Sequence, residues 1–231
     1  MTAHDSLQRP ADDFAPDSPF KAVHFQRQDE SADESFYGRP RLVNHIDDAA
    51  IGALRSYYAG IFPAGAAVLD LMSSWVSHFP PDFRPSRAAG LGMNAEELAA
   101  NPSLSEWAVH DLNIDPALPY GDAEFDAVVI AVSVQYLQRP ITVFREIRRV
   151  LKPGGICAVS FSNRCFPTKA VAVWLGTNDE THTQIVAAYF HHAGGFTPPE
   201  AIDLSPNRGE SDPLYILQAR RTDDPAAHGS P

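Results

Sequence analysis

Runs of apolar residues with the length of β-strands alternate along this chain with stretches patterned as helices. Seven such runs occur, at residues 66–72, 87–91, 107–111, 125–132, 156–161, 201–204 and 214–220. Helices are expected at residues 94–100, 140–151 and 179–192, and another from about Asp47 to Ile61 precedes the first strand. The alternation predicts an α/β fold with a doubly wound, mostly parallel sheet between two layers of helices.

The turn after the first strand is the part of this pattern most suited to ligand binding. The strand ends near one carboxylate, Asp70, and small polar residues follow it. The next stretch is predicted to be a helix that Pro80, Pro81 and Pro85 keep short. Strand-to-helix turns of this kind bind nucleotide-like ligands in open α/β sheets. Because no Gly-x-Gly-x-x-Gly run is present there, a dinucleotide-dependent dehydrogenase is disfavoured.

Charge and composition exclude several classes of partner. The 231 residues include 29 acidic and 18 basic ones, a formal net charge of −11, which disfavours nucleic acid and anionic membranes. No apolar run approaches the roughly 20 residues of a membrane span, and the N-terminus has no signal-peptide pattern. Cys157 and Cys165 lack a metal-binding spacing. We therefore expect no metal site and two reduced thiols in a cytoplasmic protein.

Composition also divides the chain into three parts. Residues 1–35 are rich in Asp, Ser, Pro and Ala, and are expected to form a flexible arm. Residues 36–221 are expected to form one folded domain, whose first part, the lid segment (residues 36–65), mixes aromatic and cationic residues with a helix. Residues 222–231 are expected to be a disordered tail.

Two motifs suggest a family. The sequence LPYGDAEFDAVV at residues 118–129, continued by SVQYL at residues 133–137, surrounds the fourth strand, and FREIRRVLKPGG at residues 144–155 leads into the fifth. In this order they resemble class I S-adenosylmethionine-dependent methyltransferases, in particular the ubiquinone and menaquinone methyltransferases that act on small molecules. The resemblance covers residues 66–162. It implies a Rossmann-like, seven-stranded sheet with an antiparallel last strand, and S-adenosylmethionine as cofactor.

The resemblance also implies where the cofactor binds. Asp70 matches the acid that pairs with the cofactor's ammonium group, and Asp111 matches the acid near the adenine amino group. The residues expected to bind the cofactor are Asp70, Leu71, Met72, Ser73, Ser74, Met93, Asn94, Asp111, Leu112 and Ser133.

At two places the chain departs from the family. Met72, Ser73 and Ser74 replace the glycines of the first turn, and the serine hydroxyls are expected to bond the cofactor's carboxylate instead. Gly92 stands where the family has an acid on the ribose hydroxyls. Asn94, or Glu96 or Glu97 one turn further on, is the expected substitute.

Methyl transfer requires an acceptor held in line with the activated methyl group and, for some acceptors, a base. Tyr136 and His45 are the expected catalytic residues, with His78 and His110 as further candidate bases. The substrate side is expected to include Tyr37, Arg41, Trp75, Asn163 and Phe166.

The expected function is methylation of an O, N, C or S atom of a small organic molecule. The residues after the fourth strand differ from the Asn/Asp-Pro-Pro-aromatic run linked to methylation of amide or adenine nitrogens, so such substrates are disfavoured. The alternative is a non-catalytic protein of the same fold that binds S-adenosylmethionine or a nucleoside as a sensor or a partner subunit.

Overall fold

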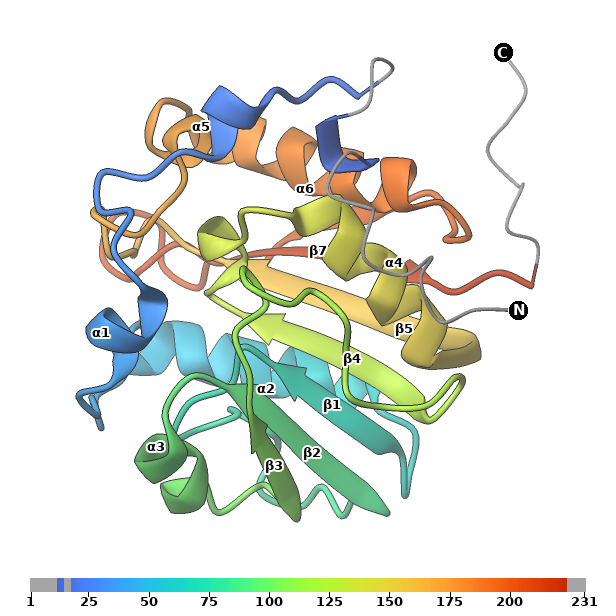
Figure 1. Cartoon of the computed structure of the whole chain (residues 1–231). Helices are drawn as coiled ribbons and strands as arrows, with labels where there is room; N and C mark the ends of the chain where they lie inside the picture. Colours follow the sequence, from blue (N-terminus) through green and yellow to red (C-terminus); the bar gives the residue numbers. More distant parts are fainter. Residues whose placement is uncertain (1–11, 15–17, 224–231) are drawn as a thin grey trace.

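A central seven-stranded sheet organises the protein in a computed structural model that describes residues 12–14 and 18–223 (Figure 1). The strands are β1 (Ala67–Leu71), β2 (Arg87–Gly92), β3 (Glu106–Val109), β4 (Phe125–Ala131), β5 (Leu151–Phe161), β6 (Glu200–Asp203) and β7 (Tyr215–Arg220). Their order across the sheet is β3-β2-β1-β4-β5-β7-β6. Among the strands of the described residues, β7 alone runs opposite to the other six, which confirms the predicted Rossmann-like topology.

Helices cover both faces of the sheet. They are α1 (Asp33–Tyr37), α2 (Asp48–Ile61), α3 (Ala95–Ala100), α4 (Pro140–Val150), α5 (Ala172–Leu175) and α6 (Asp179–Ala193), with short 3-10 turns η1 (Asp12–Phe14), η2 (Ala22–Phe25) and η3 (Val134–Tyr136). Helices α4 and α6 lie on one side and α2 on the other (Figure 1). Val68 of β1 faces the α2 side, whereas Leu69 faces α4 and α6, as the two-residue period of a strand requires.

The expected helix after β1 does not form. The described chain is irregular from Met72 until β2 begins, and Pro80, Pro81 and Pro85 remove backbone donors that a helix needs. Aromatic packing fixes the segment instead: the Phe79 ring lies 5.5 Å from that of Phe62 at the end of α2. The first turn therefore has no helix N-terminus to present to a ligand.

Strand β5 begins earlier than the sequence pattern predicts. Helix α4 ends at Val150, and β5 includes the Pro153-Gly154-Gly155 stretch that we expected to lie before it. The register with β4 shifts between Phe125 and Ala127, so the glycines lie in an irregular part of the ladder. Gly154 has a φ of 75°, a conformation that glycine adopts without steric strain.

The described part of the expected N-terminal arm packs on the domain. Phe20 and Phe25 are buried in the core on the α4 and α6 side. Lys169, after β5, is fully buried, and its Nζ donates to the Ser31 carbonyl at 2.7 Å. The boundary proposed between residues 35 and 36 stays a prediction, and residues 1–11, 15–17 and 224–231 lie outside the described residues.

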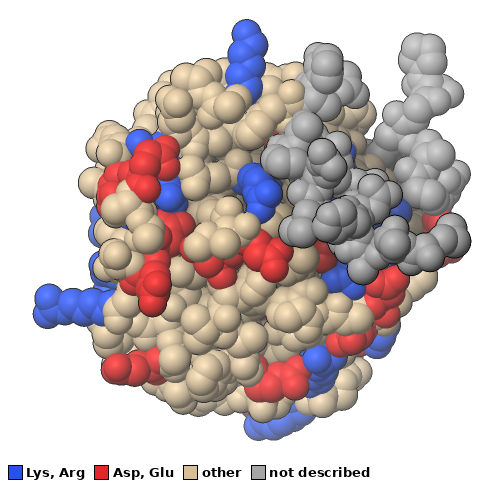
Figure 2. All heavy atoms as spheres, in the orientation of Figure 1, with Lys and Arg blue, Asp and Glu red and all other residues tan. Residues whose placement is uncertain are grey.

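The surface is mixed in charge. On the face shown in Figure 2, acidic and basic side chains are interspersed. None of the helices within residues 12–14 and 18–223 is both long enough and apolar enough to cross a membrane.

Candidate active site

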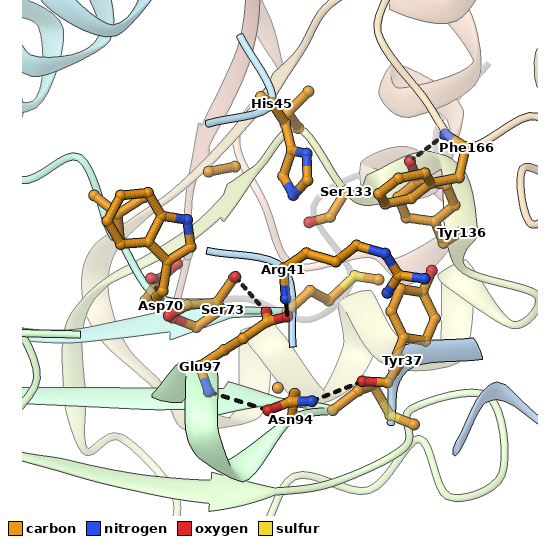
Figure 3. Close-up of a pocket in the computed structure, with 18 of the residues that line it drawn as sticks. Tyr37, Arg41, His45, Asp70, Ser73, Asn94, Glu97, Ser133, Tyr136 and Phe166 are labelled. Atoms are coloured by element: carbon orange, nitrogen blue, oxygen red, sulfur yellow. Dashed lines mark hydrogen bonds between the residues drawn. The ribbon is translucent and has the colours of Figure 1, made fainter. Parts of the chain in front are cut away.

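One cavity of about 400 Å³ opens at the carboxyl ends of β1, β2 and β4 (Figure 3). All the residues that the sequence predicts for the site line this cavity, except Leu71. Leu71 is fully buried in the sheet, because its side chain points to the α4 and α6 side. The predicted pocket is thus assembled from β-strand ends, the lid segment and the loop after β5.

Asp70 is the buried charge of the site. It is 2% exposed, and the Ser73 hydroxyl donates to its Oδ2 at 2.6 Å. Burial raises the pKa of Asp70 to about 6, and hydrogen bonds from Ser73 and Ser77 limit the rise. No cation within the described residues forms an ion pair with it. A buried carboxylate held only by hydroxyls is suited to a cationic ligand.

The structure links the two departures from the family, the missing glycines of the first turn and the glycine in place of an acid at position 92. The Ser73 amide donates to the Leu91 carbonyl at 2.8 Å, which draws the first turn onto the end of β2. A Cβ at Gly92 would lie 2.1 Å from the Ser73 carbonyl oxygen, so no side chain fits there. Met72 takes the left-handed φ of 59° for which glycine is usually needed. This strained turn thus requires glycine on β2 instead.

Glu97 and Asn94 join α3 to the lid segment. The Glu97 carboxylate accepts the Ser74 hydroxyl at 2.5 Å and the Arg41 backbone N–H at 2.7 Å. The Asn94 side-chain oxygen caps α3, and its NH₂ group donates to the Tyr37 carbonyl at 2.8 Å. Both side chains line the cavity; the Asn94 amide is used on both its oxygen and its nitrogen, whereas each Glu97 oxygen accepts one of the carboxylate's two hydrogen bonds and keeps a second acceptor position.

A second acid lies beyond β3. The Oδ1 atom of Asp111 accepts the backbone N–H groups of Asn113 at 2.9 Å and Ile114 at 3.3 Å. Neither contact uses Oδ2, so this oxygen is available to a ligand. Asn113 in turn donates to Asp33 of α1 at 2.9 Å and to the Tyr136 carbonyl at 3.1 Å. Leu112, which is 5% exposed, supplies an apolar surface beside Asp111.

Tyr136 accepts a hydrogen bond that holds the loop after β5 in place. Its hydroxyl oxygen accepts the Phe166 backbone N–H at 2.8 Å, and the two rings stack with centroids 6.0 Å apart. Burial raises the pKa of Tyr136 to about 12, so the phenol stays protonated at neutral pH. The arrangement favours positioning of the loop after β5 over proton abstraction by Tyr136.

The histidines differ in their surroundings. The His45 ring meets the Phe166 ring edge-on at 5.3 Å, and partial desolvation lowers the pKa of His45. His78 is buried with its Nδ1 unpartnered among the described residues, and burial lowers its pKa to about 4. His110 lies beside the cavity and its Nε2 is 2.7 Å from the Asp115 carbonyl.

Sequence reasoning did not place Asp33 in the pocket, and it offered Glu97 there only as an alternative to Asn94. Glu97 and Asp33 lie in the first turns of their helices. An acid at such a position is ordinarily exposed to solvent and stabilises the helix through its dipole. Their roles depend on contacts with residues far away in sequence, such as Arg41 and Asn113. Arg164 of the loop after β5 also lines the cavity. Among the described residues, no group of His, Cys, Asp and Glu is arranged to hold a metal ion.

Comparison with known proteins supports the sequence resemblance. The model of a family described as "Methyltransferase domain" matches residues 86–159. The malonyl-[acyl-carrier protein] O-methyltransferase of Hahella chejuensis is 30% identical over 48% of this chain and 40% of its own length. The ubiquinone/menaquinone biosynthesis C-methyltransferase of Nitrobacter hamburgensis is 35% identical over 32% of this chain and 34% of its own length. The chain thus spans less than half of each relative.

The fold has counterparts among solved structures. An S-adenosylmethionine-dependent methyltransferase from Mesorhizobium loti superposes with a TM-score of 0.51 and 17% identity, over 73% of this chain and 98% of that one. Both proteins therefore share the fold. The matched domain, the order of the motifs and the similar relatives support assignment of this chain to the class I S-adenosylmethionine-dependent methyltransferases, and the seven-stranded topology agrees with the fold of the solved structure.

Proposed function

We propose that the chain binds S-adenosylmethionine in this cavity and transfers its methyl group to a small organic molecule. The observation that carries the proposal is Asp70, a buried carboxylate whose pKa is raised to about 6 and which has no cationic partner among the described residues. A cationic ligand offsets the cost of burying that charge. S-adenosylmethionine carries an ammonium and a sulfonium group.

The other polar groups also fit this cofactor. Asp111 has a carboxylate oxygen available beside the apolar surface of Leu112, an arrangement suited to an amino-bearing flat ring such as adenine. The Ser133 hydroxyl is buried, has no hydrogen-bond partner among the described residues, and lines the cavity. Unpartnered buried polar groups are costly, and a bound ligand would relieve that cost.

We assign ribose recognition to Glu97. Because a side chain cannot be accommodated at Gly92, an acid for the ribose hydroxyls has to come from elsewhere. Glu97 lines the cavity and is held by the Ser74 hydroxyl. A carboxylate accepts hydrogen bonds from both hydroxyls of a ribose diol, so its chemistry suits that role.

The chain's contribution to catalysis is positioning. When bound, the cofactor supplies an electrophilic methyl group, so the acceptor needs only to be held in line with it. Tyr136 fixes the loop after β5 through the Phe166 amide, and the Phe166 and Tyr37 side chains flank the acceptor side. His45 is the residue that we propose to remove a proton where the acceptor carries one, because it is more exposed than His78 and His110, the other histidines that line the cavity.

Binding and turnover are tested separately. Calorimetric titration of the protein with S-adenosylmethionine and S-adenosylhomocysteine tests binding, and Glu97→Gln tests the assigned ribose contact. Glu96→Gln is its matched control, because Glu96 is exposed on the same helical turn. We expect weaker binding only in the Glu97 variant. No binding of either nucleoside to the unmodified chain would refute the proposal.

Turnover is measured as transfer of an isotopically labelled methyl group to a panel of small organic acids, phenols, amines and thiols. Labelled product supports the enzyme. Tight binding without transfer to any member of the panel would favour the non-catalytic sensor or partner subunit.

A further inference from the structure

Arg41 is a cation on the pocket wall that forms no ion pair with an acid in the described part of the chain. Its guanidinium lies 4.5 Å from the centre of the Phe36 ring and 5.4 Å from that of Phe166. The Phe36 and Arg39 carbonyls accept two of its N–H groups, at 2.9 and 3.4 Å. Among residues 12–14 and 18–223 no carboxylate lies within 4.0 Å of it. Since a guanidinium has five N–H donors, this one retains hydrogen-bonding capacity in a fixed position.

The charges of the cavity are separated along the sheet. Asp70 lies near the end of β1, and Glu97 and Asp111 follow β2 and β3; all three lie on one half of the cavity. Figure 3 shows Arg41 extending from Glu97, which accepts its backbone N–H, toward Phe166 and Tyr136 on the other half.

The remaining charged residues preserve this separation. Arg164, in the loop after β5, also lines the cavity, and its Nε is 3.9 Å from Asp212. Asp33, which lies just before the lid segment and also lines the cavity, is already paired with Arg27 at 2.7 Å and Lys169 at 3.3 Å. The half of the cavity around Phe166 therefore favours an anion, whereas the half around Asp70 favours a cation.

We propose that the methyl acceptor carries an oxyanion group, a carboxylate or a phosphate, which Arg41 binds beside Phe166. The proposal rests on the proposed function, because it assigns the other half of the same cavity to the cofactor. A guanidinium matches the two oxygens of such a group in a bidentate arrangement. The aromatic rings and backbone carbonyls hold Arg41 before the ligand arrives, so little side-chain freedom is lost on binding.

The proposal is tested with three small probes of similar shape: benzoate, phenyl phosphate and neutral benzamide. Each is titrated into protein saturated with S-adenosylhomocysteine, and binding is followed by ligand-observed NMR. We expect benzoate or phenyl phosphate to bind at least tenfold more tightly than benzamide. The preference for one of the two anions over the other identifies the oxyanion. Equal binding of all three, or binding of none, would overturn the proposal.

Two variants locate the contact. Arg41→Met keeps an apolar side chain on the Phe36 ring and is expected to abolish the preference for the anion. Arg39→Met is the matched control, because Arg39 is exposed two residues away and does not line the cavity. Loss of the preference in both variants, or in neither, contradicts the assignment. If Arg41→Met does not fold, Arg41→Lys keeps the charge without the planar fork and is expected to bind the anion at least threefold more weakly.

The cofactor's own carboxylate is the competing source of the anion. If Arg41→Met weakens S-adenosylhomocysteine binding at least tenfold and leaves benzoate binding unchanged, Arg41 holds the cofactor and the proposal is wrong. The proposed function fails by a different result, because it predicts that the unmodified chain binds S-adenosylhomocysteine. If it does not, titration of the probes into the free protein still shows whether Arg41 selects an anion.

Discussion

Replacing Asp70 by asparagine is expected to stabilise the free protein and to weaken cofactor binding. The change keeps the shape of the side chain and an acceptor for the Ser73 hydroxyl, but removes a charge that is 2% exposed. Burial raises the pKa of Asp70 from 3.8 to about 6, and about 1.4 kcal/mol corresponds to each pKa unit, so ionisation costs the folded state ~3 kcal/mol at pH 8.

The pH dependence follows from the direction of this shift. Because the folded pKa lies above the unfolded one, the folded state is favoured by the protonated carboxyl, and this advantage is lost as the pH rises from 3.8 to about 6. Asp70→Asn is therefore expected to match the unmodified chain near pH 4. Above pH 6 it should be more stable by up to ~3 kcal/mol, about 6–12 °C in Tm for a chain of this size.

Thermal unfolding is measured from pH 4 to pH 8 without ligand, alongside calorimetry with S-adenosylmethionine at pH 8. Asp126→Asn is the control with the opposite sign, because Lys152 at 2.8 Å pairs with Asp126 and the pKa of Asp126 is lowered. We expect that variant to lose stability at pH 8. An Asp70→Asn variant that is no more stable than the unmodified chain at pH 8, or that binds the cofactor within twofold of it, would refute this reasoning.

Three further substitutions test how the site is supported. Gly92→Ala places a Cβ against the Ser73 carbonyl and is expected to cost at least ~2 kcal/mol in urea unfolding and to weaken cofactor binding; unchanged stability would contradict the close approach. Lys169→Met leaves the carboxylates of Asp29 and Asp33 without this cation and should lower the free energy of unfolding by ~3 kcal/mol. Proteolysis of residues 20–45 should become faster, and equal cleavage rates would disprove this expectation. Tyr136→Phe removes the acceptor of the Phe166 amide and should cost ~1 kcal/mol while leaving the pH profile of turnover unchanged; a lost titration step would make Tyr136 a base.

Local patterns suffice for much of this fold. Apolar runs at strand length, the Asp47 cap of α2, the Asn94 cap of α3 and Pro140 at the start of α4 predict their elements, because these signals depend on near neighbours. The stretch after β1 shows where such reasoning fails. Its small polar residues suggest a helix start, but prolines and the packing of Phe79 against α2 hold it irregular.

The sequence by itself determined the sheet, the family and most of the residues that line the cavity, since the carboxyl ends of parallel strands meet at one edge. Only the tertiary structure decided how the departures from the family fit together. Gly92 is required by the Ser73 carbonyl, and Glu97 reaches the cavity through Ser74 and the lid segment. The placement of the Arg41 guanidinium between the Phe36 and Phe166 rings is equally a product of folding. Contacts between residues far apart in the chain create these features, and no local pattern of side chains encodes them.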